Sequence, residues 1–113
     1  MKHAIVRICG AGAAVLSLAV ATNAAALDAA AAEALMKKSG CFKCHSISQK
    51  KEGPPFKETA AKLKGKADAE KELYTHLTTN PKIKVEGREE LHDSLKTKNE
   101  ADIKNVIEWI LSR

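Results

Sequence analysis

Aromatic side chains are scarce in this 113-residue chain, which has two Phe, one Tyr and one Trp. A chain of this length is enough for one small domain, but so few aromatic residues give it little with which to build a deep apolar core. Chains near this size often add a disulfide, a metal or a cofactor. We therefore expect something other than ordinary side chains to fill the middle of the molecule.

Clusters of like charge are also lacking. Lys and Arg number 19 against 14 Asp and Glu, and two of the cations, Lys2 and Arg7, precede residue 27. The rest of the chain therefore has 17 cations and 14 acids, a net charge of +3. Its cations are interspersed with acids, as at Lys57 and Glu58. Nucleic-acid binding needs clustered Lys and Arg, so the sequence predicts no nucleic-acid partner.

The apolar run near the start is too short to cross a bilayer. It extends over residues 8–21, which is 14 residues, and a membrane-spanning helix needs about 20. Lys2 and Arg7 precede the run, and Ala24, Ala25 and Ala26 follow it. A charged start, an apolar middle and a small-residue cleavage site are the pattern of a secretory signal peptide.

This pattern divides the chain into residues 1–26, a predicted signal peptide, and residues 27–113, a predicted single domain. Cys9 lies inside the leader and would be removed with it. We therefore expect a periplasmic protein with no stable membrane span after cleavage. A leader that is retained as an uncleaved anchor remains an alternative.

The rest of the chain has helical signals and little sign of strands. Asp28 can cap a first helix that ends near Ser39 and Gly40, and Asn99 can cap the last one. Apolar residues recur at helical spacing in three further stretches, at 56–63, 69–77 and 103–110. The segment after Gly40 as far as Pro55 is predicted to be a loop. Residues 81–98 are predicted to be an irregular loop with room for a short hairpin.

One motif carries chemistry. Cys41, Cys44 and His45 form the pattern C-x-x-C-H, which is typical of covalent c-type haem attachment. Two thiols three residues apart can each add to a vinyl group on one porphyrin edge, and the next imidazole then lies under the iron. His45 is therefore the predicted proximal ligand. Haem of this kind is attached outside the cytoplasm, so the leader and the motif support each other.

Three other interpretations of the motif are weaker. Zinc needs about four ligands, and the two cysteines with His45, His76 and His92 offer no second compact pair. A redox dithiol is expected on a βαβ pattern, and no strand-rich segment precedes the motif. A structural disulfide between the two cysteines is the third alternative.

With these residues in place, the sequence resembles the class I cytochromes c, the small bacterial electron carriers, over essentially all of residues 27–113. Leu35, Met36, Lys37 and Gly40 match the end of the family's first helix, Gly53-Pro54 matches its Gly-Pro, and Trp109 matches its closing helix. The resemblance implies an all-α fold of four to five helices around one covalently attached haem c. It also implies that the Pro54 carbonyl accepts the N–H of His45, that the first and last helices cross, and that Trp109 lies near a haem propionate.

The sequence departs from the family at the sixth iron ligand, which is normally a methionine shortly before the last helix. The methionines of this chain are Met1 and Met36, and neither stands there. Counted back from Trp109, the family's position falls at about His92. We therefore predict His92 as the sixth ligand. His76 is interpreted as an exposed or half-buried helix residue, and an open sixth position remains an alternative.

These ligands predict an electron-transfer protein and not an enzyme. A second imidazole donates more strongly than a thioether, so the reduction potential is expected to be lower than that of a His/Met carrier. No catalytic constellation is recognisable. The alternatives are a haem protein that binds NO, CO or O₂ at a labile or absent sixth ligand, and the electron-accepting subunit of a periplasmic dehydrogenase.

The expected partners are redox proteins with an acidic docking surface. Cations beside a haem edge would steer such a partner, although Glu52 and Glu58 dilute the field. The lysines concerned are Lys43, Lys50, Lys51, Lys57, Lys62, Lys64 and Lys66.

Overall fold

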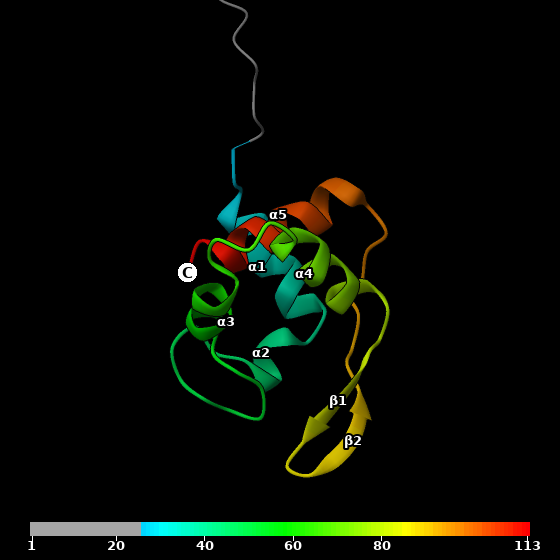
Figure 1. Cartoon of the computed structure of the whole chain (residues 1–113). Coiled ribbons are helices and arrows are strands. Elements are labelled where there is room, and N and C mark those ends of the chain that lie inside the picture. The colour runs from blue at the N-terminus through cyan, green and yellow to red at the C-terminus, as the bar shows by residue number, and fades with distance from the viewer. Residues whose placement is uncertain (1–25) are drawn as a thin grey trace, which may run out of the picture.

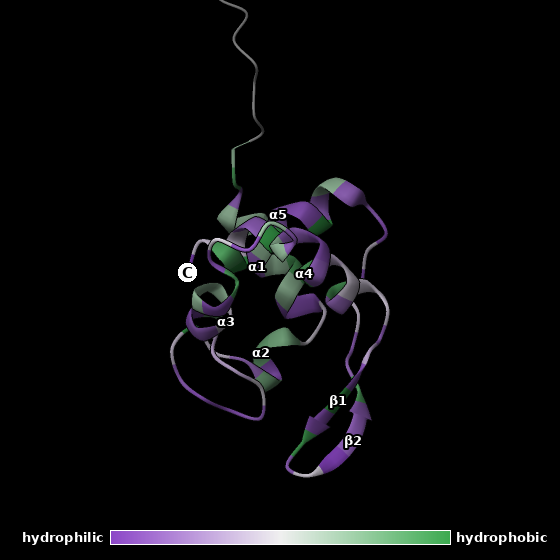
Figure 2. Ribbon diagram, in the orientation of Figure 1, coloured by the Kyte–Doolittle hydropathy of each residue, from purple (hydrophilic) through white to green (hydrophobic). Residues whose placement is uncertain are grey.

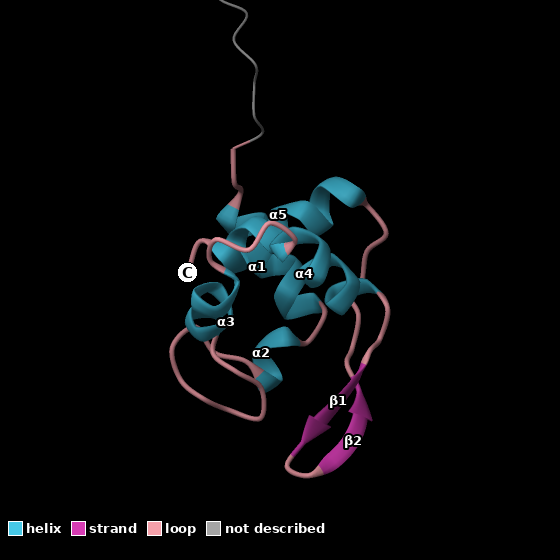
Figure 3. Ribbon diagram, viewed as in Figure 1, coloured by secondary structure: helices cyan, strands magenta, loops and turns pink. Residues whose placement is uncertain are grey.

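The computed structural model describes residues 26–113, so the predicted signal peptide, apart from Ala26, lies outside the described residues. Five helices and one hairpin make up this part of the chain (Figures 1 and 3). The helices are α1 (Ala29–Lys38), α2 (Cys41–Cys44), α3 (Phe56–Leu63), α4 (Ala69–Thr78) and α5 (Glu100–Leu111), and the strands are β1 (Lys82–Val85) and β2 (Arg88–Leu91). The mainly helical fold predicted from the sequence is therefore confirmed.

The first and last helices begin where the sequence placed their caps. The Asp28 carboxylate accepts a hydrogen bond from the backbone N–H of Ala31 at 3.0 Å. The Asn99 side chain accepts from Ala101 and Asp102 at 2.9 and 3.2 Å. Each cap satisfies N–H groups that have no partner within the helix.

Helices α1 and α5 pack against each other and form the centre of the core. The Asn105 side chain ties the two helices together because it accepts from the Asp28 N–H at 2.9 Å and donates to the Asp28 carbonyl at 2.8 Å. Trp109 has no exposed surface, and Met36 is 1% exposed. Helix α4 is joined to the start of α5 by the Tyr74 hydroxyl, which donates to Glu100 at 2.7 Å.

Residues 81–98, predicted as an irregular loop with room for a hairpin, do contain one. Strands β1 and β2 pair in antiparallel fashion, with Val85 opposite Arg88 and Lys82 opposite Leu91. Glu86 and Gly87 turn the chain with φ of 49° and 80°, which is the backbone of a tight two-residue hairpin turn. The hairpin is largely hydrophilic and projects from the helices (Figure 2).

The prediction of a loop directly after Gly40 is wrong for residues 41–44, which form the one-turn helix α2. Gly40 ends α1 with a φ of 80°, a left-handed conformation that favours glycine, and the chain can then start a new turn. The His45 N–H donates to the Cys41 carbonyl at 3.0 Å and closes that turn. Within residues 26–113, no helix has the length and apolar character needed to span a membrane.

Candidate functional site

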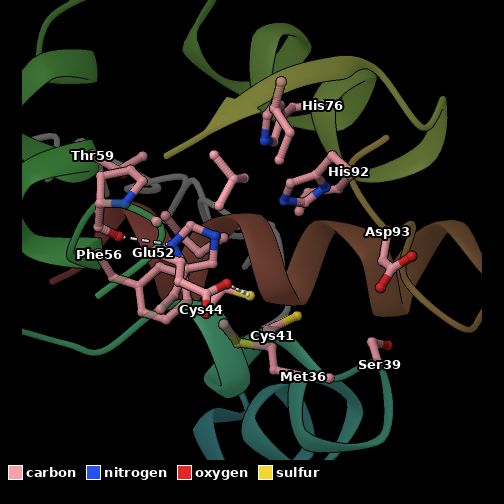
Figure 4. A pocket seen from close by; sticks show the side chains of 18 of the residues that line it. Met36, Ser39, Cys41, Cys44, Glu52, Phe56, Thr59, His76, His92 and Asp93 are labelled. Atoms are coloured by element: carbon pink, nitrogen blue, oxygen red, sulfur yellow. Dashed lines mark hydrogen bonds between the residues drawn. The ribbon is translucent and has the colours of Figure 1, made fainter. Parts of the chain in front are cut away.

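A cavity of about 370 Å³ opens beside the motif, a volume within the range of ligand sites. The motif residues Cys41, Cys44 and His45 line it, and so do His76 from α4 and His92, which directly follows β2. Figure 4 shows the two cysteines on one side of this space and the two histidines His76 and His92 side by side on the other. We call the side with His76 and His92 the distal side.

His45 is held in a fixed orientation by the turn that follows it. Its Nδ1 lies 2.7 Å from the Pro54 carbonyl oxygen, so Nδ1–H donates this bond and Nε2 is the nitrogen left to bind a metal. The Gly53 N–H donates to the Cys44 carbonyl at 2.8 Å, which brings the Gly-Pro turn back to the motif. The His45 ring also stacks on Phe56, with ring centroids 5.2 Å apart.

Both motif cysteines are half-buried free thiols. Burial raises the pKa of each thiol, and for Cys44 the hydrogen bond to Glu52, at 3.5 Å, raises it further. A redox-active dithiol depends on a cysteine with a lowered pKa. The environment of Cys41 and Cys44 therefore disfavours the dithiol interpretation.

His92 is positioned by backbone contacts with the residues after α4. Its N–H donates to the Pro81 carbonyl at 2.8 Å, and its carbonyl accepts from the Asn80 side chain at 2.9 Å. Burial is the main cause that lowers the pKa of His92, and His76 and His45 lower it further. A lowered pKa keeps the imidazole neutral, the form that binds metals.

The rings of His45 and His92 have the separation that one metal between them requires. A metal–imidazole bond is about 2.0 Å, and a ring nitrogen lies about 1.1 Å from the ring centroid, so two opposed ligands place their centroids about 6 Å apart. The observed separation is 6.2 Å. The centroids of His76 and His92 are 4.2 Å apart, too close for a metal to lie between them in this way. The donor set therefore fits a haem iron with one imidazole on each side.

His76 faces the cavity, which the sequence analysis did not predict. It is half-buried, as expected for a residue of that helix, and it lines the cavity with Leu73 and Leu77. Residues 73, 76 and 77 lie on one face of α4 because they are three and four positions apart. That spacing was the signal that would have placed His76 toward the interior.

Met36 and Trp109 have different relations to the cavity. Met36 lines it and lies next to Cys41, away from the distal side (Figure 4). Trp109 is not among the cavity-lining residues, and its indole N–H donates to Glu33 at 3.3 Å. Its ring meets Phe56 edge to face at 5.3 Å, and Phe56 lines the cavity. Contact between Trp109 and a propionate stays a prediction.

Comparison with known proteins decides the family. The sequence model of the family described as Cytochrome c matches residues 29–113. This chain belongs to the cytochrome c family. It is a small class I monohaem cytochrome c, and as in its family, one haem c is attached covalently, with Cys41 and Cys44 in the C-x-x-C-H region.

This chain is also similar to individual cytochromes c, both in sequence and in structure. A 41-residue stretch is 51% identical to cytochrome c-551 of Pseudomonas aeruginosa and covers 36% of this chain and 39% of that protein. Cytochrome c-551 of Stutzerimonas stutzeri is 39% identical over 80 residues, 71% of this chain and 74% of that one. The crystal structure of the class 1 cytochrome MtoD from Sideroxydans lithotrophicus ES-1 is similar with a TM-score of 0.73 and 44% identity, over 77% of this chain and 97% of MtoD. The predicted small cytochrome c fold is thereby confirmed.

Proposed function

We propose that this cytochrome c is an exported one-electron carrier whose haem iron is held by His45 and His92. The observation that carries the proposal is the 6.2 Å separation of the two ring centroids across the cavity. Cys41 and Cys44 would form the thioether bonds. The bound haem supplies an iron that gains and loses one electron.

The chain's own residues account for the properties expected of such a carrier. Pro54 holds the Nδ1 proton of His45, which fixes the tautomer and makes Nε2 a stronger donor. His92 would add a second imidazole in place of a thioether, which would favour ferric iron and lower the reduction potential. With His45 and His92 both bound, the iron would have no position left for a substrate. These features suit electron transfer and not catalysis.

Some lysines near the motif are already paired within the molecule, so only part of the positive charge of this surface would attract a redox partner. Lys62 pairs with Glu58 at 2.9 Å, and Lys66 lies 3.6 Å from Glu72. The Lys51 ammonium donates to the carbonyl of Phe42, a residue of the C-x-x-C-H motif, at 2.8 Å. Pairing dilutes the positive field, so steering of an acidic partner would depend chiefly on lysines outside these contacts, such as Lys43.

A redox titration tests the carrier function and its ligands together. The purified holoprotein should be low-spin in both oxidation states and follow a one-electron curve. His92→Met in a His76→Ala background, where His76 cannot bind in place of the sulfur, should restore the sulfur ligand usual in the family and raise the midpoint potential. His76→Ala alone serves as the matched control, and its potential should stay at that of the parent. Equal potentials in the double variant and in His76→Ala would contradict the assignment of His92.

Carbon monoxide distinguishes the carrier from a small-molecule binder. A parent protein with two imidazole ligands should bind CO slowly after reduction, because a ligand has to leave first. Rapid binding would favour the NO, CO or O₂ binder. Purification in a fixed complex would favour the dehydrogenase subunit instead.

Export is supported by the pattern of residues 1–26 and by the chemistry of haem attachment. The N-terminal sequence of the holoprotein from a periplasmic extract should begin at Leu27. Holoprotein that still carries the leader and remains with the membranes would contradict cleavage at this position.

A further inference from the structure

The distal side of the cavity holds two imidazoles, whereas a haem iron bound to His45 would take only one ligand on that side. His76 and His92 both line the cavity, and their ring centroids are 4.2 Å apart at an angle of 50°. Figure 4 shows the two side chains adjacent to each other. Only one of them could bind at a given moment, because the four porphyrin nitrogens and His45 would leave a single position at the iron.

The proposed distal ligand is less firmly fixed at its ring than the proximal one. A histidine bound to a metal usually donates its other N–H to an acceptor, as His45 does to Pro54. The Nδ1 of His92 is buried and has no hydrogen-bond partner among the described residues. The His92 backbone is tied down at Pro81 and Asn80, so the side chain is the part free to move.

We propose that His76 is a reserve axial ligand, which binds the haem iron whenever the His92 imidazole is displaced. The inference rests on the proposed function, in which His92 is the ligand of the parent protein. In the exchange one iron–nitrogen bond, from His92, breaks and one from His76 forms. Both imidazoles are neutral, so neither charge nor oxidation state changes.

The backbone contacts around the pair make this exchange a local event. Leu77 directly follows His76, and its carbonyl accepts a hydrogen bond from the Leu95 N–H at 2.9 Å. The His92 N–H donates to the Pro81 carbonyl. The end of α4 and the chain around His92 therefore stay together while the side chains rotate.

A reserve ligand would keep the iron six-coordinate when His92 moves away. External ligands such as CO would then find the distal site closed, and the carrier would lose no electrons to side reactions with small molecules. The second histidine would thus protect electron transfer without taking part in it.

Three holoprotein variants test the proposal: His92→Ala, His76→Ala and the double variant. Optical spectra in both oxidation states report the spin state, and the rate of CO binding reports an open site. We expect His76→Ala to match the parent and His92→Ala to remain low-spin with slow CO binding. The double variant should lose the low-spin spectrum and bind CO rapidly. Recovery of that spectrum with added imidazole would show that its cavity is still folded.

Other outcomes separate this proposal from the one it rests on. A high-spin His92→Ala protein, equal to the double variant, overturns the reserve role and leaves His92 as the ligand. A double variant that stays low-spin without imidazole also overturns it, since another group then binds. A high-spin His76→Ala protein beside a low-spin His92→Ala protein overturns both proposals, because His76 is then the ligand of the parent.

Discussion

The imidazole of His45 and the backbone of Gly53 are in such close contact that no side chain fits between them. A Cβ atom at position 53 would lie 2.7 Å from His45 Nδ1 and 2.9 Å from Nε2, distances that real Cβ atoms essentially never show. Gly53 N–H also donates to the Cys44 carbonyl. The glycine of the Gly-Pro turn is therefore required by steric contact with the proximal histidine.

Gly53→Ala should displace the His45 ring and break its hydrogen bond to Pro54. We expect a cost of about 1–3 kcal/mol in the free energy of unfolding, as for other overpacked sites, and a lower yield of protein with haem attached. Denaturant unfolding of the holoprotein and the haem content of the purified protein measure the two effects.

Gly87→Ala is the control for this substitution. A Cβ there meets nothing within 4 Å, and only the positive φ of 80° resists it, at a cost of about 1 kcal/mol. The haem content should stay at the parent's value. An equal loss of haem in both variants would contradict the steric explanation.

Removal of both thiols, in a Cys41→Ala, Cys44→Ala variant, should prevent covalent attachment of haem. The cavity of about 370 Å³ would then be left within a small core that has few aromatic residues. We expect the variant to be largely unfolded, with most of its far-ultraviolet helical signal lost. Lys43→Ala, an exposed change between the two cysteines, is the control and should keep the parent spectrum. A haem-free variant with native helicity would show that the polypeptide folds without its cofactor.

Trp109→Ala should destabilise the protein by about 3–5 kcal/mol, because it leaves a hole in the fully buried packing of α1 against α5. The substitution also removes the donor to Glu33. Glu33→Gln, which keeps an acceptor for the indole, should cost about 1 kcal/mol or less. Chemical unfolding of both holoproteins measures these changes. If both variants lost the same free energy of unfolding, the hydrogen bond to Glu33, and not the buried ring, would be the main contribution of Trp109 to stability.

Tyr74 should keep its proton to higher pH than an ordinary tyrosine. The hydrogen bond to Glu100 raises its pKa above the usual value of 10. A pKa raised by folding means that the stabilising contact is present below about pH 10 and is lost as the pH rises through the folded-state pKa. Tyr74 is the only tyrosine, so ¹³C NMR of tyrosine-labelled protein follows it without overlap. Glu100→Gln should move the pKa back toward 10, and an unchanged titration would contradict the contact.

Much of the fold could be predicted from the sequence because its signals are local. The caps Asp28 and Asn99 and the spacing of apolar residues place four helices, and the structure has all of them. Helix α2 was missed because four residues are too short for a periodic pattern, and its turn depends on the left-handed Gly40. The sequence specifies the hairpin only weakly because its strands are charged and mostly exposed.

The site was harder to predict wherever it depends on contacts between distant segments. The motif and the Gly-Pro turn are local, and the bond from His45 to Pro54 lies where the resemblance implied. The approach of His76 to His92 joins residues 16 positions apart through the packing of α4, which no local pattern specifies. The burial of Trp109 against Glu33 is likewise a tertiary contact.

The most direct test of the account is the near-infrared magnetic circular dichroism spectrum of the oxidised parent holoprotein. The charge-transfer band of low-spin ferric haem differs between two imidazole ligands and one imidazole with a thioether. With His45 and His92 across the cavity, the band should be that of bis-imidazole iron. A band of imidazole–thioether iron, or a high-spin spectrum, would contradict histidine ligation on both sides.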